Sequence, residues 1–171
     1  MTAAVLWTLL ALPFVGSVIA AVLPTHARTL GGLVAGTVSV AGLALTVGAY
    51  ASLDQGSALV ANAAWLPSLG LSLQIRLDGL SWLFAFLVLA IGLLVVIYAH
   101  YYMSARDPVP RFFSFFLAFM GSMLGLVLSG NLIQLAFFWE LTSLFSFLLI
   151  GYWHHNEKAR SSARMALIVT A

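Results

Sequence analysis

The sequence predicts an all-α protein that crosses a membrane several times and carries a short β-hairpin between its second and third spans. Three observations lead to this prediction. Of the 171 residues, 63% are hydrophobic and only 7% are charged, whereas a soluble domain usually carries about 25% charged residues. The apolar residues fall into stretches of ~20, the length that a helix needs to cross a bilayer. The stretch LSLQIRLD (71–78) instead alternates apolar and polar residues, which is typical of a strand.

Five apolar stretches have the length of a spanning helix, and a sixth is incomplete. They cover residues 3–23, 30–50, 79–101, 112–129 and 131–152, with the sixth at 161–171. Prolines and polar residues separate them, because proline cannot continue a helix. The first stretch has no preceding basic segment and is longer than the apolar part of a signal peptide, so it is interpreted as an uncleaved span. The chain is therefore predicted to be a single membrane domain and, because the sixth span has no end, a fragment of a larger protein.

Residues 51–78 are the exception to the helical pattern. The turn-prone WLPSLG (65–70) precedes the alternating stretch, and together they predict a hairpin at about 65–78 on the membrane surface. Arg76 and Asp78 lie on either side of Leu77, so they share one face of the strand. A surface ion pair between them is the expected consequence.

Basic residues in the loops predict the orientation. The loops at 24–29, 102–111 and 153–160, with the start of the sixth span, share one side of the membrane. That side carries six basic residues and the other side only Arg76, so the positive-inside rule places these loops in the cytoplasm and the N-terminus and hairpin outside. The six are Arg28, Arg106, Arg111, Lys158, Arg160 and Arg164.

One acid, Glu140, lies in the middle of the fifth apolar stretch, within FFWELTSLFSFLLIGYW (137–153). A charge at the bilayer centre costs about 2.5–3.5 kcal/mol, so a partner, a water-filled cavity or protonation must offset it. Small residues at helical spacing, Ala136, Ser143 and Gly151, predict that Glu140 faces into a helix bundle. Two interpretations remain open: a proton or cation site, and a structural acid that is hydrogen-bonded to a neighbouring helix. Any cationic partner within the membrane would come from beyond residue 171 or from another chain.

Accessory polar residues surround this candidate site. Thr142, Ser143 and Ser146 could hold water near Glu140. His100, at the end of the third span, is either an interfacial residue or a point where protons enter. His154 is adjacent to His155, and adjacent side chains do not face one another on a helix, so these two are interpreted as interface residues with a potential pH-sensing role and not as metal ligands.

Several functional classes lack support in the sequence. There is no cysteine, no nucleophile or nucleotide-binding motif, and no basic run of the kind that binds nucleic acid. We therefore expect neither an enzyme nor a metal site. Gly32 and Gly36 form a G-x-x-x-G pattern that predicts helix packing. Asn131 is a predicted helix cap, and Gln134 either lines a water path or bonds a neighbouring helix.

The segment FMGSMLGLVLSGNLIQLAFFWELTSLFSFLLIGYWHHNEKARSSARMALIVT (119–170), together with LDGLSWLF (77–84), closely resembles the N-terminal part of the A subunit of the Mrp (Mnh, Pha) cation/proton antiporters. These are related to the antiporter-like membrane subunits of respiratory complex I. The resemblance implies that Glu140 is the acid of a glutamate–lysine pair in a proton path, with the lysine on a seventh helix beyond this chain.

The resemblance also implies a bacterial cell-membrane complex of several different subunits, surrounded by lipid, that exchanges sodium ions for protons without a cofactor. Two alternatives stay open. One is a proton-translocating membrane subunit of an NADH-quinone oxidoreductase or a membrane hydrogenase. The other is a structural subunit with no transport role. The exchanged ion, whether sodium, potassium or calcium, also stays open.

Overall fold

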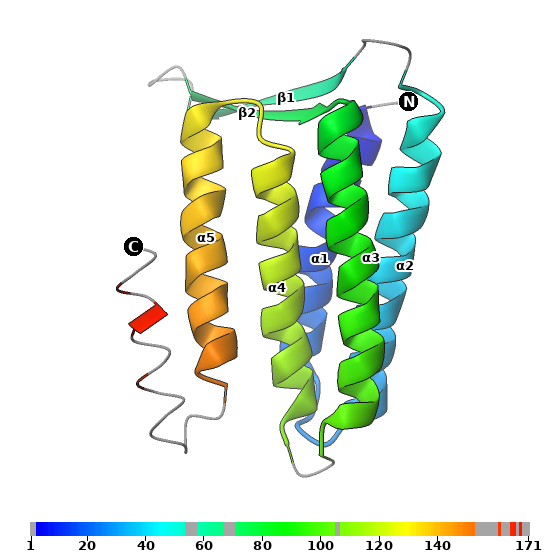
Figure 1. Ribbon diagram of the computed structural model, residues 1–171, viewed down its shortest axis with the longest axis vertical. Helices are drawn as coiled ribbons and strands as arrows, with labels where there is room; N and C mark the ends of the chain where they lie inside the picture. The colour runs from blue at the N-terminus through cyan, green and yellow to red at the C-terminus, as the bar shows by residue number, and fades with distance from the viewer. Residues whose placement is uncertain are drawn as a thin grey trace.

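The computed structural model describes residues 3–53, 58–66, 71–104 and 107–152, together with Ser161, Met165, Ala166 and Ile168. Within this part of the chain, five helices run side by side and a two-stranded hairpin lies across one end of them (Figure 1). All five are long and apolar enough to cross a membrane, which confirms the predicted spans and hairpin. The predicted sixth span falls almost entirely outside the described residues. The helices are α1 (Ala3–Val22), α2 (Arg28–Tyr50), α3 (Gly79–Tyr102), α4 (Val109–Val127) and α5 (Leu132–Ile150).

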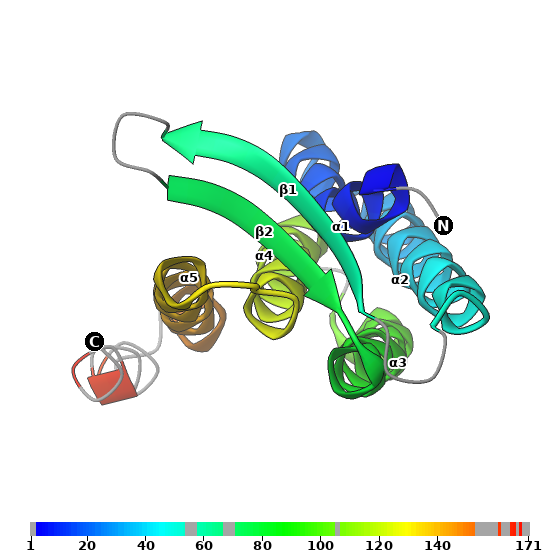
Figure 2. The same ribbon diagram turned by 90° about the horizontal axis from the view of Figure 1, so that it is seen from above.

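Helix α4 is the central helix of the bundle. It lies between α3 and α5, with α1 behind it (Figures 1 and 2). Its apolar side chains Phe113, Leu117 and Leu124 are completely buried. The buried hydroxyl of Ser122 donates a hydrogen bond to the Ala118 carbonyl at 2.9 Å, so it needs no partner outside the helix. Small and self-satisfied residues of this kind allow helices to approach closely without leaving polar groups unpaired in lipid.

Helix α4 begins three residues earlier than the sequence predicts. Pro108 and Pro110 do interrupt the chain after α3, as expected, but Pro108 is the N-cap residue and the helix starts at Val109. Proline is tolerated in the first turn, because its missing N–H would have no partner within the helix and its φ angle is already helical. Both prolines therefore favour the start of α4 and do not delay it.

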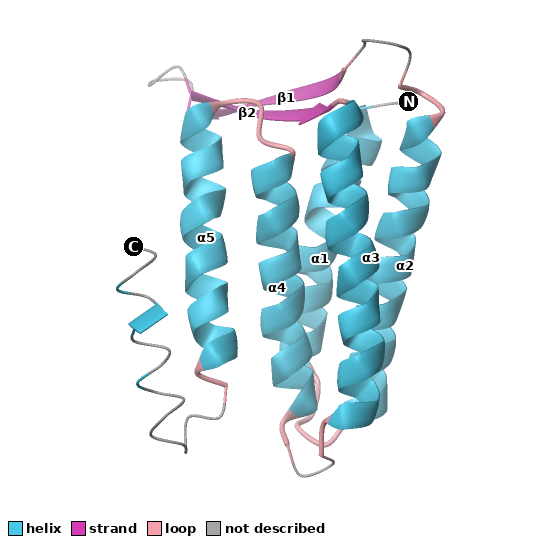
Figure 3. Ribbon diagram, viewed as in Figure 1, coloured by secondary structure: helices cyan, strands magenta, loops and turns pink. Residues whose placement is uncertain are grey.

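The hairpin consists of β1 (Leu59–Leu66) and β2 (Leu71–Leu77), which pair antiparallel with Leu59 opposite Leu77 (Figure 3). The alternating stretch is β2, as predicted. The prediction that the hairpin starts at about residue 65 is wrong, since β1 begins at Leu59 and includes Trp65. Its outer positions, Val60 and Ala64 among them, are mostly apolar although exposed, so the sequence of β1 shows no alternation of polarity.

The second edge of β2 pairs with the turn between α4 and α5. Ile75 forms a bridge with Ser129, and the Arg76 N–H donates to the Leu128 carbonyl at 2.9 Å. The Gly130 N–H donates to the Gln74 carbonyl at 2.7 Å. Figure 2 shows the hairpin curving over the ends of the helices. The hairpin is thus attached by backbone hydrogen bonds to the turn that leads into α5.

Asp78 connects the hairpin to α3. Its side chain accepts a hydrogen bond from the Ser81 N–H at 2.9 Å, and the Ser81 hydroxyl accepts one from the Asp78 N–H at 2.7 Å, which makes a capping box. Arg76 Nε lies 3.3 Å from the Asp78 carboxylate, which confirms the predicted ion pair. The hydrogen bond from the Ser81 N–H, then that from the Ser81 hydroxyl, and then the charge of Arg76 hold the pKa of Asp78 below its ordinary value of 3.8.

This lowered pKa predicts a pH-dependent contribution of Asp78 to stability. A carboxylate whose pKa is lower in the folded state stabilises the fold fully above its unfolded pKa, and loses this effect as the pH falls through the folded pKa. The Asp78→Asn variant keeps a capping side chain but cannot ionise. We expect thermal unfolding in detergent to show the native chain as more stable than Asp78→Asn at pH 7. This difference should shrink as the pH falls below about 4, and a constant difference from pH 7 to pH 3 would contradict it.

Candidate functional site

Helix α5 places Glu140 near the middle of the helix's length. Asn131 is its N-cap, as predicted, and the Asn131 side chain accepts a hydrogen bond from the Gln134 N–H at 2.8 Å. Glu140 is the ninth of the 19 residues of α5. At a rise of about 1.5 Å per residue, it lies about 12 Å from the start of the helix and about 15 Å from its end. The carboxylate is therefore far from both ends of the span.

The side chain of Glu140 is exposed. Among the described residues, none forms an ion pair or a hydrogen bond with it. The face of α5 that packs on α4 is carried by Phe138, which lies against Gly125 of α4. Of the small residues expected to mark the packed face, Ser143 is buried but Ala136 is exposed. The described helices thus cover a different side of α5 from the one that presents Glu140, and they supply no partner for it.

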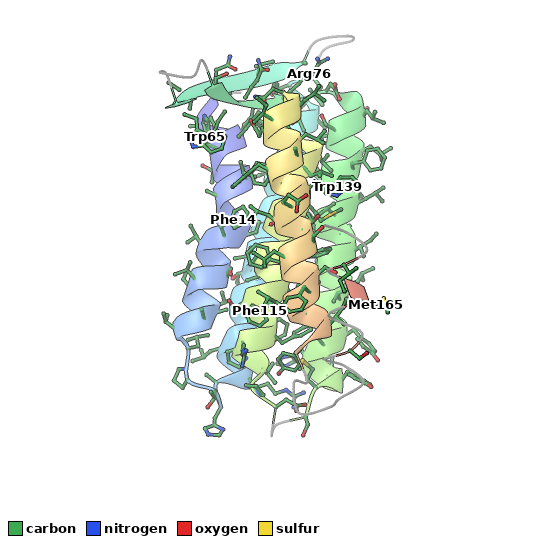
Figure 4. The ribbon with its side chains drawn as sticks, turned by 90° about the vertical axis from the view of Figure 1, so that its left-hand side faces the viewer. Phe14, Trp65, Arg76, Phe115, Trp139 and Met165 are labelled. Carbon is green, nitrogen blue, oxygen red and sulfur yellow. The ribbon has the colours of Figure 1, made fainter. Side chains whose placement is uncertain are left out.

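A groove of about 440 Å³ lies between α4 and α5, and Glu140 is not among the residues that line it. Trp139 projects from the middle of α5 (Figure 4) and forms part of its wall. The Thr142 hydroxyl donates to the Trp139 carbonyl at 2.6 Å. The structure therefore brings together three predicted accessory residues, all hydroxyl-bearing, in one groove. The residues lining it are Phe119, Met123 and Leu126 of α4 and Trp139, Thr142, Ser143 and Ser146 of α5.

The predicted histidines do not join this site. His100 is in the last turn of α3, and α4 lies between α3 and α5 (Figure 1). There, the Arg28 guanidinium of α2 donates a hydrogen bond to the His100 carbonyl. This contact satisfies one of the carbonyls that the end of a helix leaves unpaired, and it was not foreseen from the sequence. His154 lies outside the described residues.

Gln134 is the polar residue whose role the sequence left open. It is 1% exposed, and its Oε1 atom accepts a hydrogen bond from the Gln74 N–H of β2 at 2.7 Å. Its partner is therefore the hairpin and not a neighbouring helix. A lone amide one turn inside an apolar helix was the only signal in the sequence. Together with Asn131, whose side-chain amide donates to the Ser72 carbonyl at 2.9 Å, Gln134 joins α5 to β2.

Replacing Gln134 by methionine is expected to lower stability by about 1–3 kcal/mol, because the part-buried Gln74 N–H then loses its acceptor. Methionine has a similar length, so loss of packing is small. Thr37→Val is a matched control, since the Thr37 hydroxyl bonds only the Val34 carbonyl of its own helix and is exposed. Urea or thermal unfolding in detergent measures both variants. Equal stability of the two would exclude a stabilising role for the bond between Gln134 and β2.

No cluster of three or more histidine, aspartate or glutamate side chains that could hold a metal ion occurs among residues 3–53, 58–66, 71–104 and 107–152. The chemistry available near Glu140 is that of one carboxyl group and three hydroxyl groups. A carboxyl group can take up and release a proton, and hydroxyl groups can hold water molecules that carry it.

Two family models match the chain. Residues 65–113 match the N-terminus of chain 5 of NADH-ubiquinone oxidoreductase (complex I), and residues 129–171 match the membrane segment of the NADH:quinone oxidoreductase/Mrp antiporter family. The first model covers β2, α3 and the start of α4, and the second covers α5 with the residues that follow it.

Individual proteins agree with the family models. The chain is 56% identical over 92% of its length to the A/B subunit of a probable K⁺/H⁺ antiporter of Rhizobium meliloti. It is 46% identical over 71% of its length to the A subunit of the Na⁺/H⁺ antiporter of Alkalihalophilus pseudofirmus. It spans only 16% and 15% of these two relatives.

A solved structure shows the same fold. In the Mrp complex from Dietzia sp. DQ12-45-1b, the matching chain has a TM-score of 0.79 and 32% sequence identity. The match covers 96% of this chain and 17% of the other. The chain therefore belongs to the family of antiporter-like membrane proteins that includes the A subunit of the Mrp-type antiporters, and it is similar to the N-terminal part of that protein.

Proposed function

We propose that this chain contributes the proton-loading carboxylate, Glu140, to a multisubunit cation/proton antiporter. The observation that carries the proposal is the depth of Glu140 in α5, about 12 Å from the nearer end of the helix. A carboxylate at this depth is costly in lipid, and such residues mark ion or proton pathways. The groove between α4 and α5 contains Thr142, Ser143 and Ser146, within two turns of Glu140 along the helix, and these hydroxyl groups support a supply of water to the carboxyl group.

The partners of the site lie beyond the described helices in this proposal. Glu140 is exposed on α5. In this proposal another membrane helix covers it and supplies its cationic partner. That helix comes either from a later part of the same protein or from a different protein of the complex. The relatives are named as A or A/B subunits of antiporters, which supports a hetero-oligomer. Their names differ in the ion, K⁺ in one and Na⁺ in the other. The exchanged ion of this chain is accordingly proposed only as a monovalent cation, with sodium as the first candidate.

The proposed orientation places the hairpin outside a bacterial cell membrane. Of the described basic residues, Arg28 and Arg111 lie at the starts of α2 and α4, at the end of the bundle opposite the hairpin. Arg76 lies in the hairpin (Figure 4). An excess of basic residues on the cytoplasmic side is the general rule for membrane proteins. The loops at 24–29, 102–111 and 153–160 are then cytoplasmic, although residues 105, 106 and 153–160 lie outside the described part of the chain.

A second candidate function is proton translocation in a quinone-linked or hydrogenase-linked complex. The match of residues 65–113 to chain 5 of complex I favours it. Both functions use Glu140 as a proton site, and they differ in the driving reaction. Cation-dependent proton movement across inverted membrane vesicles, measured with and without a respiratory substrate, separates them. Exchange driven by an added sodium or potassium gradient alone supports the antiporter.

A further inference from the structure

A second groove, distant from Glu140, lies between α2 and α3 at the end of the bundle opposite the hairpin. Its volume is about 220 Å³. Its walls are rows of residues four apart on each helix, so it runs along the helix axes for about two turns. Leu33 is 58% and Ile97 is 49% exposed, so the groove opens on the outer surface of the bundle. It is lined by Thr29, Leu33 and Gly36 on α2 and by Val96, Ile97 and Tyr101 on α3, among others.

Two glycines of α2 shape this groove differently. At Gly32, an added Cβ would lie 2.5 Å from Nδ1 of His100, so the missing side chain makes room for the imidazole ring. At Gly36, one turn deeper, an added Cβ would meet nothing within 4 Å. The predicted packing role of the G-x-x-x-G pattern therefore holds for Gly32 but not for Gly36. The missing side chain at Gly36 leaves space inside the groove instead.

Arg28 places a positive charge beside Thr29, which lines one end of the groove. Arg28 is the first residue of α2, and α2 begins without a capping side chain. The Arg28 N–H donates to the His26 carbonyl, and the helix dipole favours negative charge at this end of α2. The Arg28 guanidinium reaches the His100 carbonyl, while its buried Nε atom has no hydrogen-bond partner among the described residues. The described residues lining the groove include no acidic side chain.

We propose that this groove binds one anionic phospholipid. The phosphate lies at the start of α2, beside Arg28 and the Thr29 hydroxyl, and one acyl chain follows Leu33, Gly36 and Ile97 into the membrane. Charge complementarity selects the anionic head group, and the apolar walls select the hydrocarbon chain. Stacked aromatic rings at the same level, Tyr98 and Tyr102 with centroids 5.0 Å apart, are typical of the membrane interface where head groups lie.

Native mass spectrometry of the full chain tests this proposal. Each variant is purified in detergent and offered equal amounts of phosphatidylglycerol and phosphatidylcholine with acyl chains of different mass. The native chain is expected to retain one phosphatidylglycerol in preference to phosphatidylcholine. Gly36→Leu fills the groove and is expected to lose this bound lipid. Gly48→Leu is the matched control, because an added Cβ at Gly48 of the same helix also meets nothing within 4 Å, and it should retain the lipid.

Additional experiments identify the lipid head group and test the proposal without relying on the Gly36→Leu variant alone. Arg28→Gln is expected to lose the preference for phosphatidylglycerol over phosphatidylcholine. An excess of inorganic phosphate should not displace the lipid, whereas displacement would point to a free-anion site. Photoactivatable phosphatidylglycerol, added to the unaltered chain, should cross-link residues 29–36 of α2. Equal retention of both lipids by the native chain, unchanged lipid binding by Gly36→Leu, or cross-links confined to other helices would overturn the proposal.

Discussion

Replacing Glu140 by glutamine in the complete antiporter complex is expected to reduce cation-dependent proton exchange to the background of vesicles that lack the complex. Glutamine has nearly the same shape and can still form hydrogen bonds, but it cannot take up and release a proton near neutral pH. The change therefore removes the proposed chemistry and leaves packing almost unaltered. Proton uptake by inverted vesicles, followed with a fluorescent pH indicator after addition of sodium or potassium, measures the effect.

Two further variants separate the proton role of Glu140 from a structural one. Glu140→Asp keeps a carboxyl group and should keep part of the exchange. Glu140→Leu removes every polar atom, so a purely structural acid predicts retained exchange and a helix that is more stable in lipid. Co-purification of the other subunits shows whether each variant assembles. Normal exchange by an assembled Glu140→Gln complex would remove Glu140 from the mechanism, and the structural alternative would then be preferred.

Replacing Gly125 by leucine is expected to have the largest effect on stability among the substitutions considered. Gly125 lies in α4 directly against the ring of Phe138 in α5, and a Cβ atom there would overlap the ring. Phe138 is 6% exposed, so the ring has little room to move. Inserting carbon atoms into packed interiors costs about 1–3 kcal/mol and sometimes more. Separation of α5 from α4 would relieve this overlap, so the variant should also alter the groove between these two helices.

Gly48→Leu provides the control for this prediction, because the same substitution enters open space there. Thermal unfolding in detergent, followed by circular dichroism, gives the two stabilities. We expect Gly125→Leu to unfold at a clearly lower temperature and Gly48→Leu to unfold close to the native chain. If both variants unfold at the same temperature, the contact between Gly125 and Phe138 does not hold α5 in place.

The sequence by itself determined the five spans of the described residues, the position of β2 and the depth of Glu140. These features depend on local requirements that the bilayer imposes on any chain. A backbone in lipid must bond internally, so each span is a run of ~20 apolar residues that is visible in the sequence. The depth of Glu140 follows from counting residues along such a run. The alternation of apolar and polar residues in LSLQIRLD likewise identifies a strand without any information on what the strand packs against.

Only the tertiary structure decided which face of α5 packs on α4, where β1 lies, and that Gln134 and the α4–α5 turn bond to β2. Helix α5 is apolar on nearly all sides, and lipid is as apolar as a neighbouring helix, so its sequence carries no contrast between inner and outer faces. The sequence of β1 likewise gives no contrast between its two faces, because few of its exposed positions are polar. Arg28 and His100 meet across 72 residues, and a contact between such distant positions follows from the packing of whole helices and not from any local pattern.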